Sequence, residues 1–518
     1  MEDSLIFFLL LFSPLALGAV HAWAYCTVAV FSLIIFYSHF LTDASSLKRA
    51  LKLPVSVGLL LLIGIAFFSI VPLPENLIKI LSPAAYDLRE KYMAGPASWQ
   101  TLSIYPRATV EYLLKGLSYA AVFLVIVAKM ISKTGEPYSV QSTAYSAIPP
   151  DAQRNNAITQ QRNNATTQKR NNAITYDEMP SGFFHTFVTL GALAAILAIL
   201  VHSVCDFNLH IPANALYFTV ILAVIAGLSL TREKYSFDYS FIDRLVNWMI
   251  GVGFIVAVFA VLQKFSWNGK IYWLIEKPGA HFGPYINYDH YAGYMEMCAF
   301  LAIAYFAGHM ASSSFFKIRK IKDRIIWFSS PEANKTLIYL FFAAIMVASL
   351  FLSTSRGGII SFAMALVLFA YLVLSNIKKK KRTRLFLSII FAFLLIVIMI
   401  VWFGPEETVQ RFKVLNAIIR SLIKESPILS ETRPYFWKDT LHLMKVFPLF
   451  GTGLGTYSYV FPAYRTFSAS YGFLRYAHND YLQFIAEMGV FAYVFIVAFF
   501  VWYVRKLRIC LRRLREEI

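Results

Sequence analysis

Residues 336–375 read TLIYLFFAAIMVASLFLSTSRGGIISFAMALVLFAYLVLS, two apolar runs separated by the polar break Ser353-Thr-Ser-Arg-Gly-Gly358. Each run is close to the ~20 residues that an α-helix needs to cross the hydrocarbon core of a bilayer. The stretch therefore predicts two consecutive membrane-spanning helices, with Arg356 at the connection between them.

Similar apolar runs recur along the whole chain of 518 residues, which is 58% hydrophobic and only 15% charged. Soluble domains do not have this composition, so the sequence predicts an all-α polytopic membrane protein with about 12 transmembrane helices. The predicted spans are 5–20, 22–42, 54–73, 110–130, 184–205, 212–231, 245–264, 290–310, 335–352, 356–376, 384–403 and 481–504.

The distribution of Lys and Arg predicts the orientation of these spans. Most basic residues fall in the segments 43–53, 131–183, 232–244, 311–335, 377–384 and 505–518. Basic residues concentrate in cytoplasmic segments, so both termini are expected in the cytoplasm. The net charge of +19 is then a sign of topology and does not indicate nucleic-acid binding. A cleaved signal peptide begins with basic residues, whereas this chain begins with the acidic Glu2 and Asp3. This favours a first span that is retained.

The spans divide the chain into six parts. Helices 1–4 occupy 1–130, and 131–183 contains a thrice-repeated Arg-Asn-Asn-Ala unit that predicts a disordered cytoplasmic linker. A transmembrane hairpin follows at 184–231, and helices 7–11 occupy 232–403. The polar interval 404–480 is predicted to be a large helical loop outside the membrane, and 481–518 holds the last span and a basic tail. Four dispersed cysteines predict neither disulfides nor a metal site.

Ionisable residues near the spans gather at their outer ends, which predicts a site opening to the external face. Arg356 begins a span there, where Ser353 or Thr354 can cap the helix and Gly357 and Gly358 let a ligand approach. Free N–H groups, the helix dipole and a guanidinium suit a phosphate or pyrophosphate. An arginine that extends to lipid headgroups is an equally weighted alternative. Asp206, His281, Asp289, His290, Glu296, His478, Asp480 and Glu487 lie at the same ends.

The interval 404–480 is unusually polar for this chain and closes on Tyr476-Ala-His-Asn-Asp-Tyr-Leu482. Residues 407–424 and 433–446 have the apolar spacing of helices. His478 has the chemistry to accept a proton from an attacking hydroxyl, although a lone interfacial histidine is more often a hydrogen-bonding side chain. The run Gly451-Thr-Gly-Leu-Gly455 follows no strand, which favours a tight turn over nucleotide binding.

Several stretches together resemble the O-antigen ligase and polymerase superfamily, bacterial inner-membrane enzymes that act on undecaprenyl-diphosphate-linked glycans. The resemblance covers most of 1–130 and 240–505 and rests on the order and spacing of its motifs. These motifs are Ser353-Thr-Ser-Arg-Gly-Gly358, Arg433-Pro-Tyr-Phe-Trp437, Phe447-Pro-Leu-Phe-Gly-Thr-Gly-Leu-Gly-Thr456, His478-Asn-Asp-Tyr-Leu-Gln483 with Glu487-Met-Gly489 and, as in one branch, Gly283-Pro-Tyr-Ile-Asn287 with His290-Tyr-Ala-Gly293.

The resemblance implies an inverting, metal-independent glycosyl transfer at the periplasmic face, without a cofactor. His478 would activate the acceptor hydroxyl, and Arg356 and Arg433 would hold the diphosphate of the donor. Further candidates for donor contact are Gly357, Arg411 and Arg465, and those for an acceptor or sugar subsite are Arg475, Asn479, Asp480, Tyr464 and Tyr481.

One segment departs from the family pattern. Residues 202–214, His-Ser-Val-Cys-Asp-Phe-Asn-Leu-His-Ile-Pro-Ala-Asn, resemble a stretch that follows the His-Asn-Asp-Tyr motif in related proteins. Here it lies in the middle of the chain, so we expect an insertion or rearrangement between about 131 and 231. Packing of spans five and six beside the last span would agree with this hypothesis.

The resemblance fits a ligase that transfers a glycan to a lipid A–core or another hydroxyl acceptor. Polymerases and protein O-oligosaccharyltransferases share the donor site, so the motifs leave these alternatives open. A transporter or flippase of lipid-linked sugars is the alternative from another class, and it predicts midplane charges and interrupted helices in both halves. The sequence has neither feature clearly, which favours an enzyme.

Overall fold

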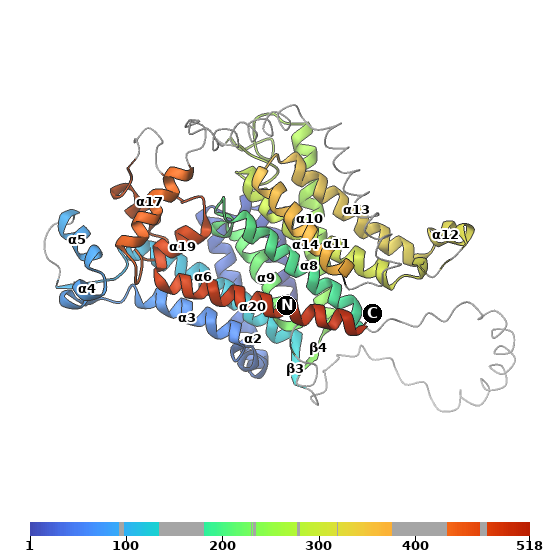
Figure 1. The fold of residues 1–518 in the computed structure, drawn as a ribbon, viewed down its shortest axis with the longest axis horizontal. Coiled ribbons are helices and arrows are strands. Elements are labelled where there is room, and N and C mark those ends of the chain that lie inside the picture. Colours follow the sequence, from blue (N-terminus) through green and yellow to red (C-terminus); the bar gives the residue numbers. More distant parts are fainter. Residues whose placement is uncertain are drawn as a thin grey trace.

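The computed structural model describes residues 1–92, 98–133, 181–228, 230, 235–276, 280–316, 318, 320–375, 433–466 and 474–517. The linker repeats, the predicted span 384–403, the predicted helix 407–424 and Arg411 lie outside the described residues. The described chain is mostly helical, with two short antiparallel sheets (Figure 1).

The secondary structure runs as follows. The first helices are α1 (Glu2–Leu15), η1 (Leu17–Ala19), α2 (Ala22–Leu51), α3 (Pro54–Phe68), α4 (Glu75–Leu81), α5 (Pro83–Tyr92) and α6 (Pro106–Met130). The central helices are α8 (Ser181–His202), η3 (Asn208–His210), α9 (Pro212–Leu228), α10 (Tyr239–Phe265), α11 (Tyr288–Ser312), η4 (Ser314–Phe316), α12 (Ile321–Trp327), α13 (Pro331–Leu352) and α14 (Arg356–Ser375). The last are α17 (Arg433–Val446), α18 (Tyr457–Val460), η5 (Phe461–Ala463), α19 (Asp480–Met488) and α20 (Val490–Glu517). Strand β1 (Leu73–Pro74) pairs with β2 (Trp99–Gln100), and β3 (Ile131–Lys133) pairs with β4 (Tyr235–Phe237).

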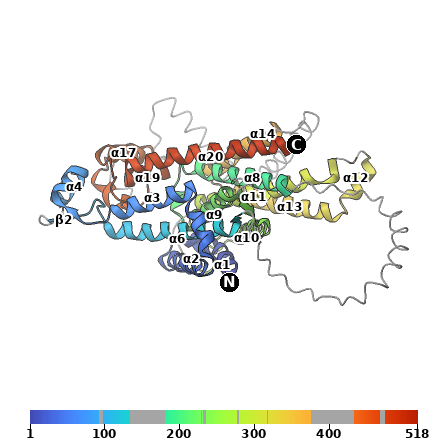
Figure 2. The same cartoon turned by 90° about the horizontal axis from the view of Figure 1, so that it is seen from below.

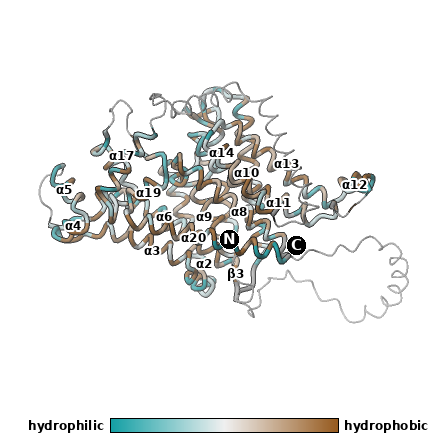
Figure 3. The backbone as a smooth tube through the Cα atoms, in the orientation of Figure 1, coloured by the Kyte–Doolittle hydropathy of each residue, from teal (hydrophilic) through white to brown (hydrophobic). Residues whose placement is uncertain are grey.

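Eight helices in the described part of the chain are long and apolar enough to cross a membrane, namely α2, α6, α8, α10, α11, α13, α14 and α20. The apolar helices α1, α3 and α9 are shorter, with 14, 15 and 17 residues. Every predicted span other than 384–403 overlaps one of these helices. Figure 3 shows hydrophobic colouring along most of them and hydrophilic colouring near the end of α20. This architecture is that of an all-α polytopic membrane protein.

Two predicted spans are interrupted by residues with positive φ. The predicted span 5–20 ends early, because α1 stops at Leu15 and Leu17–Ala19 have φ values of 57°, 70° and 57°, which no α-helix contains. The predicted span 481–504 is divided at Gly489, which has a φ of 61°. A Cβ at Gly489 would lie 2.4 Å from the carbonyl oxygen of Leu449, so the turn between α19 and α20 requires glycine.

The hairpin formed by α8 and α9 lies inside the bundle. Figure 2 shows it between α20 on one side and α1 and α2 on the other. The Tyr503 hydroxyl of α20 donates to the Leu193 carbonyl of α8 over 2.8 Å. Arg513 Nη1, also from α20, donates to the Leu228 carbonyl at the end of α9 over 2.6 Å. The predicted spans five and six therefore both pack beside the last span.

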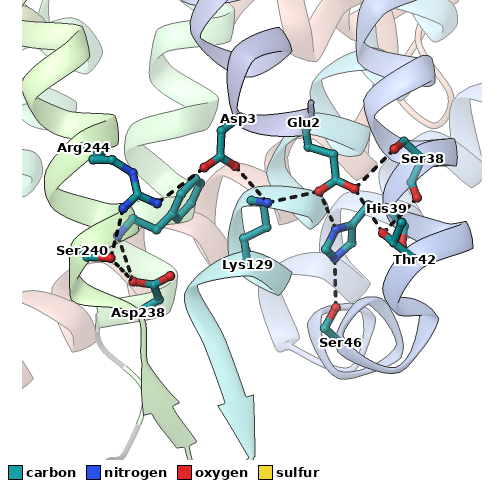
Figure 4. A network of polar contacts seen from close by, with 11 residues as sticks. Glu2, Asp3, Ser38, His39, Thr42, Ser46, Lys129, Asp238, Ser240 and Arg244 are labelled. Atoms are coloured by element: carbon teal, nitrogen blue, oxygen red, sulfur yellow. Dashed lines mark hydrogen bonds and ion pairs between the residues drawn. The ribbon is translucent and has the colours of Figure 1, made fainter. Parts of the chain in front are cut away.

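Polar side chains join four helices at one end of the bundle (Figure 4). Lys129 Nζ of α6 lies 3.1 Å from Glu2 Oε2 and 2.9 Å from Asp3 Oδ1, both on α1. His39 Nδ1 of α2 lies 3.0 Å from Glu2 Oε2, and Arg244 Nη2 of α10 lies 3.5 Å from Asp3 Oδ2. The two acidic residues at the start of the chain thus pair with basic residues from three other helices.

The opposite end of the bundle collects the connections that build the candidate site. Helices α8 and α13 finish there, and α9, α11 and α14 begin there. The predicted helix 433–446 is confirmed as α17, and the segment between α3 and α6 forms the short helices α4 and α5. Helix α17 lies beside α19, whose first residues carry the predicted histidine motif (Figure 1).

Candidate active site

Two loops that are far apart in the sequence are bound together at this end. One is the α8–α9 loop, residues 203–211, and the other is the segment 476–480 before α19. The Asp480 N–H donates to the carbonyls of Ser203 and Asp206, over 3.0 and 3.2 Å. The Leu209 N–H donates to Asp480 Oδ2 over 3.0 Å, and His210 Nδ1 lies 2.6 Å from Asp480 Oδ1. These contacts fix the position of the segment that carries His478.

His478 faces a buried carboxylate from the other loop. Its Nδ1 lies 3.4 Å from Asp206 Oδ1, and the Asp206 side chain is only 2% exposed against 28% for His478. His478 has a φ of 51°, an uncommon backbone conformation for a residue other than glycine. With Nδ1 donating to the carboxylate, Nε2 is the nitrogen left to accept a proton.

The pKa of the Asp206 carboxyl is held below its usual range by the net result of opposing effects. Burial raises it, because the charged form loses its hydration. The hydrogen bond with His478 and the charges of His290 and His202 lower it by more. Asp206 is therefore ionised at neutral pH, and it can stabilise a positive charge that forms on His478.

Phe207 supplies an apolar wall beside this pair. Its ring stacks on Tyr476 with the ring centroids 4.1 Å apart, and it meets the rings of His478 and His290 edge-on at 4.9 and 4.6 Å. The two histidines are thus held against the same aromatic ring. This packing restricts the rotation of His478 and keeps its Nδ1 toward Asp206.

The start of α14 is capped by Ser355, rather than by Ser353 or Thr354 as predicted. The Gly358 N–H donates to Ser355 Oγ over 3.1 Å, and this hydroxyl donates to Asp289 Oδ1 over 2.6 Å. An N-cap side chain accepts from the residue three positions later, which from Gly358 points back to Ser355. Arg356 is then the first helical residue and is partly exposed.

The glycines after Arg356 allow close packing of helices. A Cβ at Gly357 would lie 2.8 Å from His202 Nε2 and 3.1 Å from Cys205 Sγ. A Cβ at Gly358 would lie 2.5 Å from the Cβ of Ala292. The glycines therefore bring the first turn of α14 against the end of α8 and the start of α11.

Arg433, at the start of α17, lies near the same loop. Burial raises the pKa of the Cys205 thiol to about 11, and the charge of Arg433 opposes this rise. Since Cys205 also abuts Gly357, the Arg433 charge and the first turn of α14 approach the same side chain. Arg356 and Arg433, which are far apart in the sequence, therefore both lie near the α8–α9 loop.

The glycine run at 451–455 is a tight turn, as predicted, and it is held by Glu487. Glu487 Oε2 accepts from the Gly455 N–H over 2.7 Å, and its Oε1 accepts from the Tyr457 N–H over 3.1 Å. Gly451, Gly453 and Gly455 all have positive φ, which glycine adopts without strain. The turn packs on α19 and so supports the helix that follows His478.

Three residues predicted for the acceptor or sugar subsite use their polar atoms within the protein. Asn479 Oδ1 caps α19 by accepting from the Leu482 N–H over 3.0 Å, and Asp480 binds the α8–α9 loop as described above. The Tyr481 hydroxyl donates to the Leu200 carbonyl over 2.8 Å. These contacts give all three a part in holding His478 in place.

The remaining predicted residues lie around α17. The Tyr464 ring packs against Phe447 at a centroid distance of 5.8 Å, and Arg465 follows it, partly exposed. The next residue, Thr466, is tied to Asp439 of α17 by its N–H and its hydroxyl, each over 2.8 Å. Arg475 is exposed, three residues before His478.

The site contains residues to which the sequence analysis gave no role. From the sequence, Asp206 and His290 are recognisable only as ionisable groups at span ends, and Phe207 carries no signal of its own. The available signal was the family-like segment 202–214, because in related proteins it follows the histidine motif. No group of three or more His, Cys, Asp or Glu in the described residues is arranged to hold a metal ion.

Comparison with known proteins identifies the part of the chain that carries the histidine. Residues 341–509 match the family model Wzy_C, described as O-antigen ligase, and this confirms the resemblance. No curated protein and no solved structure matches the chain. The match includes Arg356, Arg433 and His478, whereas Asp206 lies outside it. With the membrane helices, it indicates a membrane protein of O-antigen ligase or polymerase type. The similarity to the O-antigen ligase family therefore lies in residues 341–509.

Proposed function

We propose that the protein is a membrane glycosyltransferase that moves a glycan from undecaprenyl diphosphate to a hydroxyl of a lipid A–core or similar acceptor. The observation that carries this proposal is the contact between His478 and the ionised Asp206, beside the arginine-bearing start of α14. A histidine oriented by a buried carboxylate has the arrangement of a general base. The family match adds the class of donor.

In the proposed reaction, His478 Nε2 takes the proton of the acceptor hydroxyl while the hydroxyl oxygen attacks the anomeric carbon of the donor. A new glycosidic bond forms as the bond from that carbon to the diphosphate oxygen breaks. The electron pair of the broken bond leaves with undecaprenyl diphosphate. The single displacement inverts the anomeric centre, and Asp206 stabilises the imidazolium that forms.

Arg356 and Arg433 are proposed to bind the diphosphate. Guanidinium groups pair with phosphate oxygens through two parallel hydrogen bonds, and the charge on a leaving diphosphate grows during the displacement. Arg356 adds the favourable field at a helix N-terminus. Gly357, Arg465 and Arg411 remain proposed secondary donor contacts, the last of them outside the described residues.

The acceptor is proposed to approach from the side of Arg475 and Tyr464, because Asn479, Asp480 and Tyr481 are engaged within the protein. Polymerases and protein O-oligosaccharyltransferases would use the same donor site with a different acceptor. A choice of acceptors offered to one protein separates these reactions. A lipid-linked sugar transporter would bind the donor without releasing undecaprenyl diphosphate.

The proposed location is the bacterial inner membrane, with both termini in the cytoplasm and the site at the periplasmic face. The Glu2, Asp3 and Lys129 cluster and the basic end of α20 would then face the cytoplasm. We further propose that 184–231 is a displaced carboxy-terminal hairpin. Its contacts with α20, and the contacts of its loop with His478 and Gly357, support this idea.

The test uses purified full-length protein in lipid nanodiscs with an undecaprenyl-diphosphate glycan and several candidate acceptors. We expect acceptor-dependent release of undecaprenyl diphosphate by the wild type. His478→Ala should bind the donor and transfer about 10²- to 10⁴-fold more slowly, whereas His442→Ala, at an exposed histidine of α17, should behave as the wild type. Undiminished transfer by His478→Ala would refute the proposed base. Donor binding without any release would favour a transporter.

A further inference from the structure

Two adjacent residues at the start of α11, Asp289 and His290, face different parts of the candidate site. One faces the start of α14, which carries Arg356, and the other faces Asp206 behind His478. Asn287 caps this helix by accepting from the Asp289 N–H over 2.8 Å, which fixes the orientation of the first turn. Asp289 and His290 then point to different partners. The family match at 341–509 does not include them, and the proposed reaction gives them no role.

Asp289 holds the cap of the arginine-bearing helix. Its Oδ1 accepts from Ser355 Oγ over 2.6 Å, and the same hydroxyl accepts from the Gly358 N–H over 3.1 Å. The carboxylate therefore fixes the rotation of the Ser355 hydroxyl so that a lone pair faces the helix. Arg356 is the residue between this cap and the glycines, so its backbone position depends on the contact.

His290 faces the second oxygen of Asp206. Its Nε2 lies 3.8 Å from Asp206 Oδ2, while the first oxygen faces His478. His290 and Asp206 are both buried, and neither of these two facing atoms has a hydrogen-bond partner among the described residues. Burial without partners is costly for a carboxylate oxygen, and a facing imidazole N–H reduces this cost. Phe207 packs edge-on against both histidines and holds them at their separation.

We propose that the first turn of α11 is a positioning element, in which Asp289 sets the donor arginine and His290 sets the carboxylate behind the base. The inference rests on the proposed function and deepens it. Because the two residues are adjacent on one rigid helix, they fix the distance between the donor-binding half and the proton-accepting half. A small displacement of either half lowers the rate of a reaction that requires both to be aligned.

The proposal predicts opposite kinetic signatures for two neighbouring residues. Asp289→Leu should weaken binding of undecaprenyl diphosphate, measured as a Kd with no acceptor present, about tenfold. Asp289→Asn should bind nearly as the wild type, since its amide oxygen still accepts from Ser355. His290→Phe keeps the packing against Phe207 but loses the N–H, so kcat should fall about 10- to 100-fold with the donor Kd unchanged. His290→Gln, which retains an N–H donor, should recover part of kcat.

His309→Phe, at the other end of the same helix, is the matched control and should change neither parameter. Each variant is compared with the wild type in thermal unfolding, so that loss of folding is recognised. If Asp289→Leu and His290→Phe alter Kd and kcat in parallel, or alter neither, the positioning role is overturned. If the wild type itself neither binds the donor nor transfers the glycan, the proposed function fails and this inference fails with it.

Discussion

His210 Nδ1 lies 2.6 Å from Asp480 Oδ1, and this contact mirrors the one between His478 and Asp206. Each of the two loops gives a histidine to an aspartate of the other. The His210–Asp480 pair is the shorter of the two, and Asp480 also accepts from the Leu209 N–H. It therefore holds the loops together, while the longer His478–Asp206 pair retains a partly exposed histidine for chemistry.

The His210–Asp480 contact predicts a pH-dependent stability. Burial lowers the pKa of His210, but the hydrogen bond and the charge of Asp480 raise it by more, so the net pKa lies above its ordinary value of 6.5. A pKa raised in the folded state contributes stability that is complete below the unfolded value and is lost as pH rises through the folded value. We expect the Tm to fall as pH rises above about 6.5. Asp480→Asn should have a lower Tm at acidic pH and a flatter pH dependence; an unchanged slope would contradict the assignment.

Asp206→Asn tests the partner of the proposed base. The substitution keeps the size of the side chain, but the amide can present an N–H to His478 and stabilises no positive charge on it. We expect donor binding to be retained and kcat to fall about 10²- to 10⁴-fold. Steady-state kinetics with a fixed acceptor would measure this change. A kcat within about twofold of the wild type would remove Asp206 from the mechanism.

Substitutions of Arg356 test whether the diphosphate requires the planar guanidinium group or only a positive charge. Lysine keeps the charge but lacks the planar fork that binds two phosphate oxygens, so Arg356→Lys should retain only part of the transfer rate. Arg356→Ala should lower kcat about 10²- to 10³-fold and weaken donor binding. Measuring kcat and the Kd for undecaprenyl diphosphate separates these effects. Full activity in Arg356→Ala would place the donor elsewhere.

The cluster of Glu2, Asp3 and Lys129 lies at the other end of the bundle from the candidate site. A substitution there should change the stability of the protein without acting directly on the site. Lys129→Met removes the cation that contacts both Glu2 and Asp3. These groups are partly buried, so the free energy of unfolding should fall by about 1–3 kcal/mol, between the values for exposed and buried pairs. Lys79→Met, which breaks an exposed pair with Glu75, is the control and should have no measurable effect. Equal stability of both variants would contradict the expected contribution of the cluster.

Much of the local structure follows from the sequence because its causes are local. A run of apolar residues long enough to cross a bilayer defines α10, α11, α13 and α14 without reference to the rest of the chain. The spacing at 433–446 predicts α17 with the observed bounds. The errors lie at turns. The division at Gly489 and the cap at Ser355 depend on what packs against them, namely the Leu449 carbonyl and the Asp289 carboxylate.

The amino-acid sequence is enough to recognise the apolar helices, the histidine motif before α19 and the arginine at the start of α14. Two contacts become visible only in the folded protein: Asp206 faces His478 across 272 positions of the chain, and Asp480 is bound to the α8–α9 loop. The difference arises because the two kinds of structure depend on contacts over different distances along the chain. Helix formation depends on neighbours within a few positions, whereas these contacts exist only after α8 and α9 have packed inside the bundle beside α20.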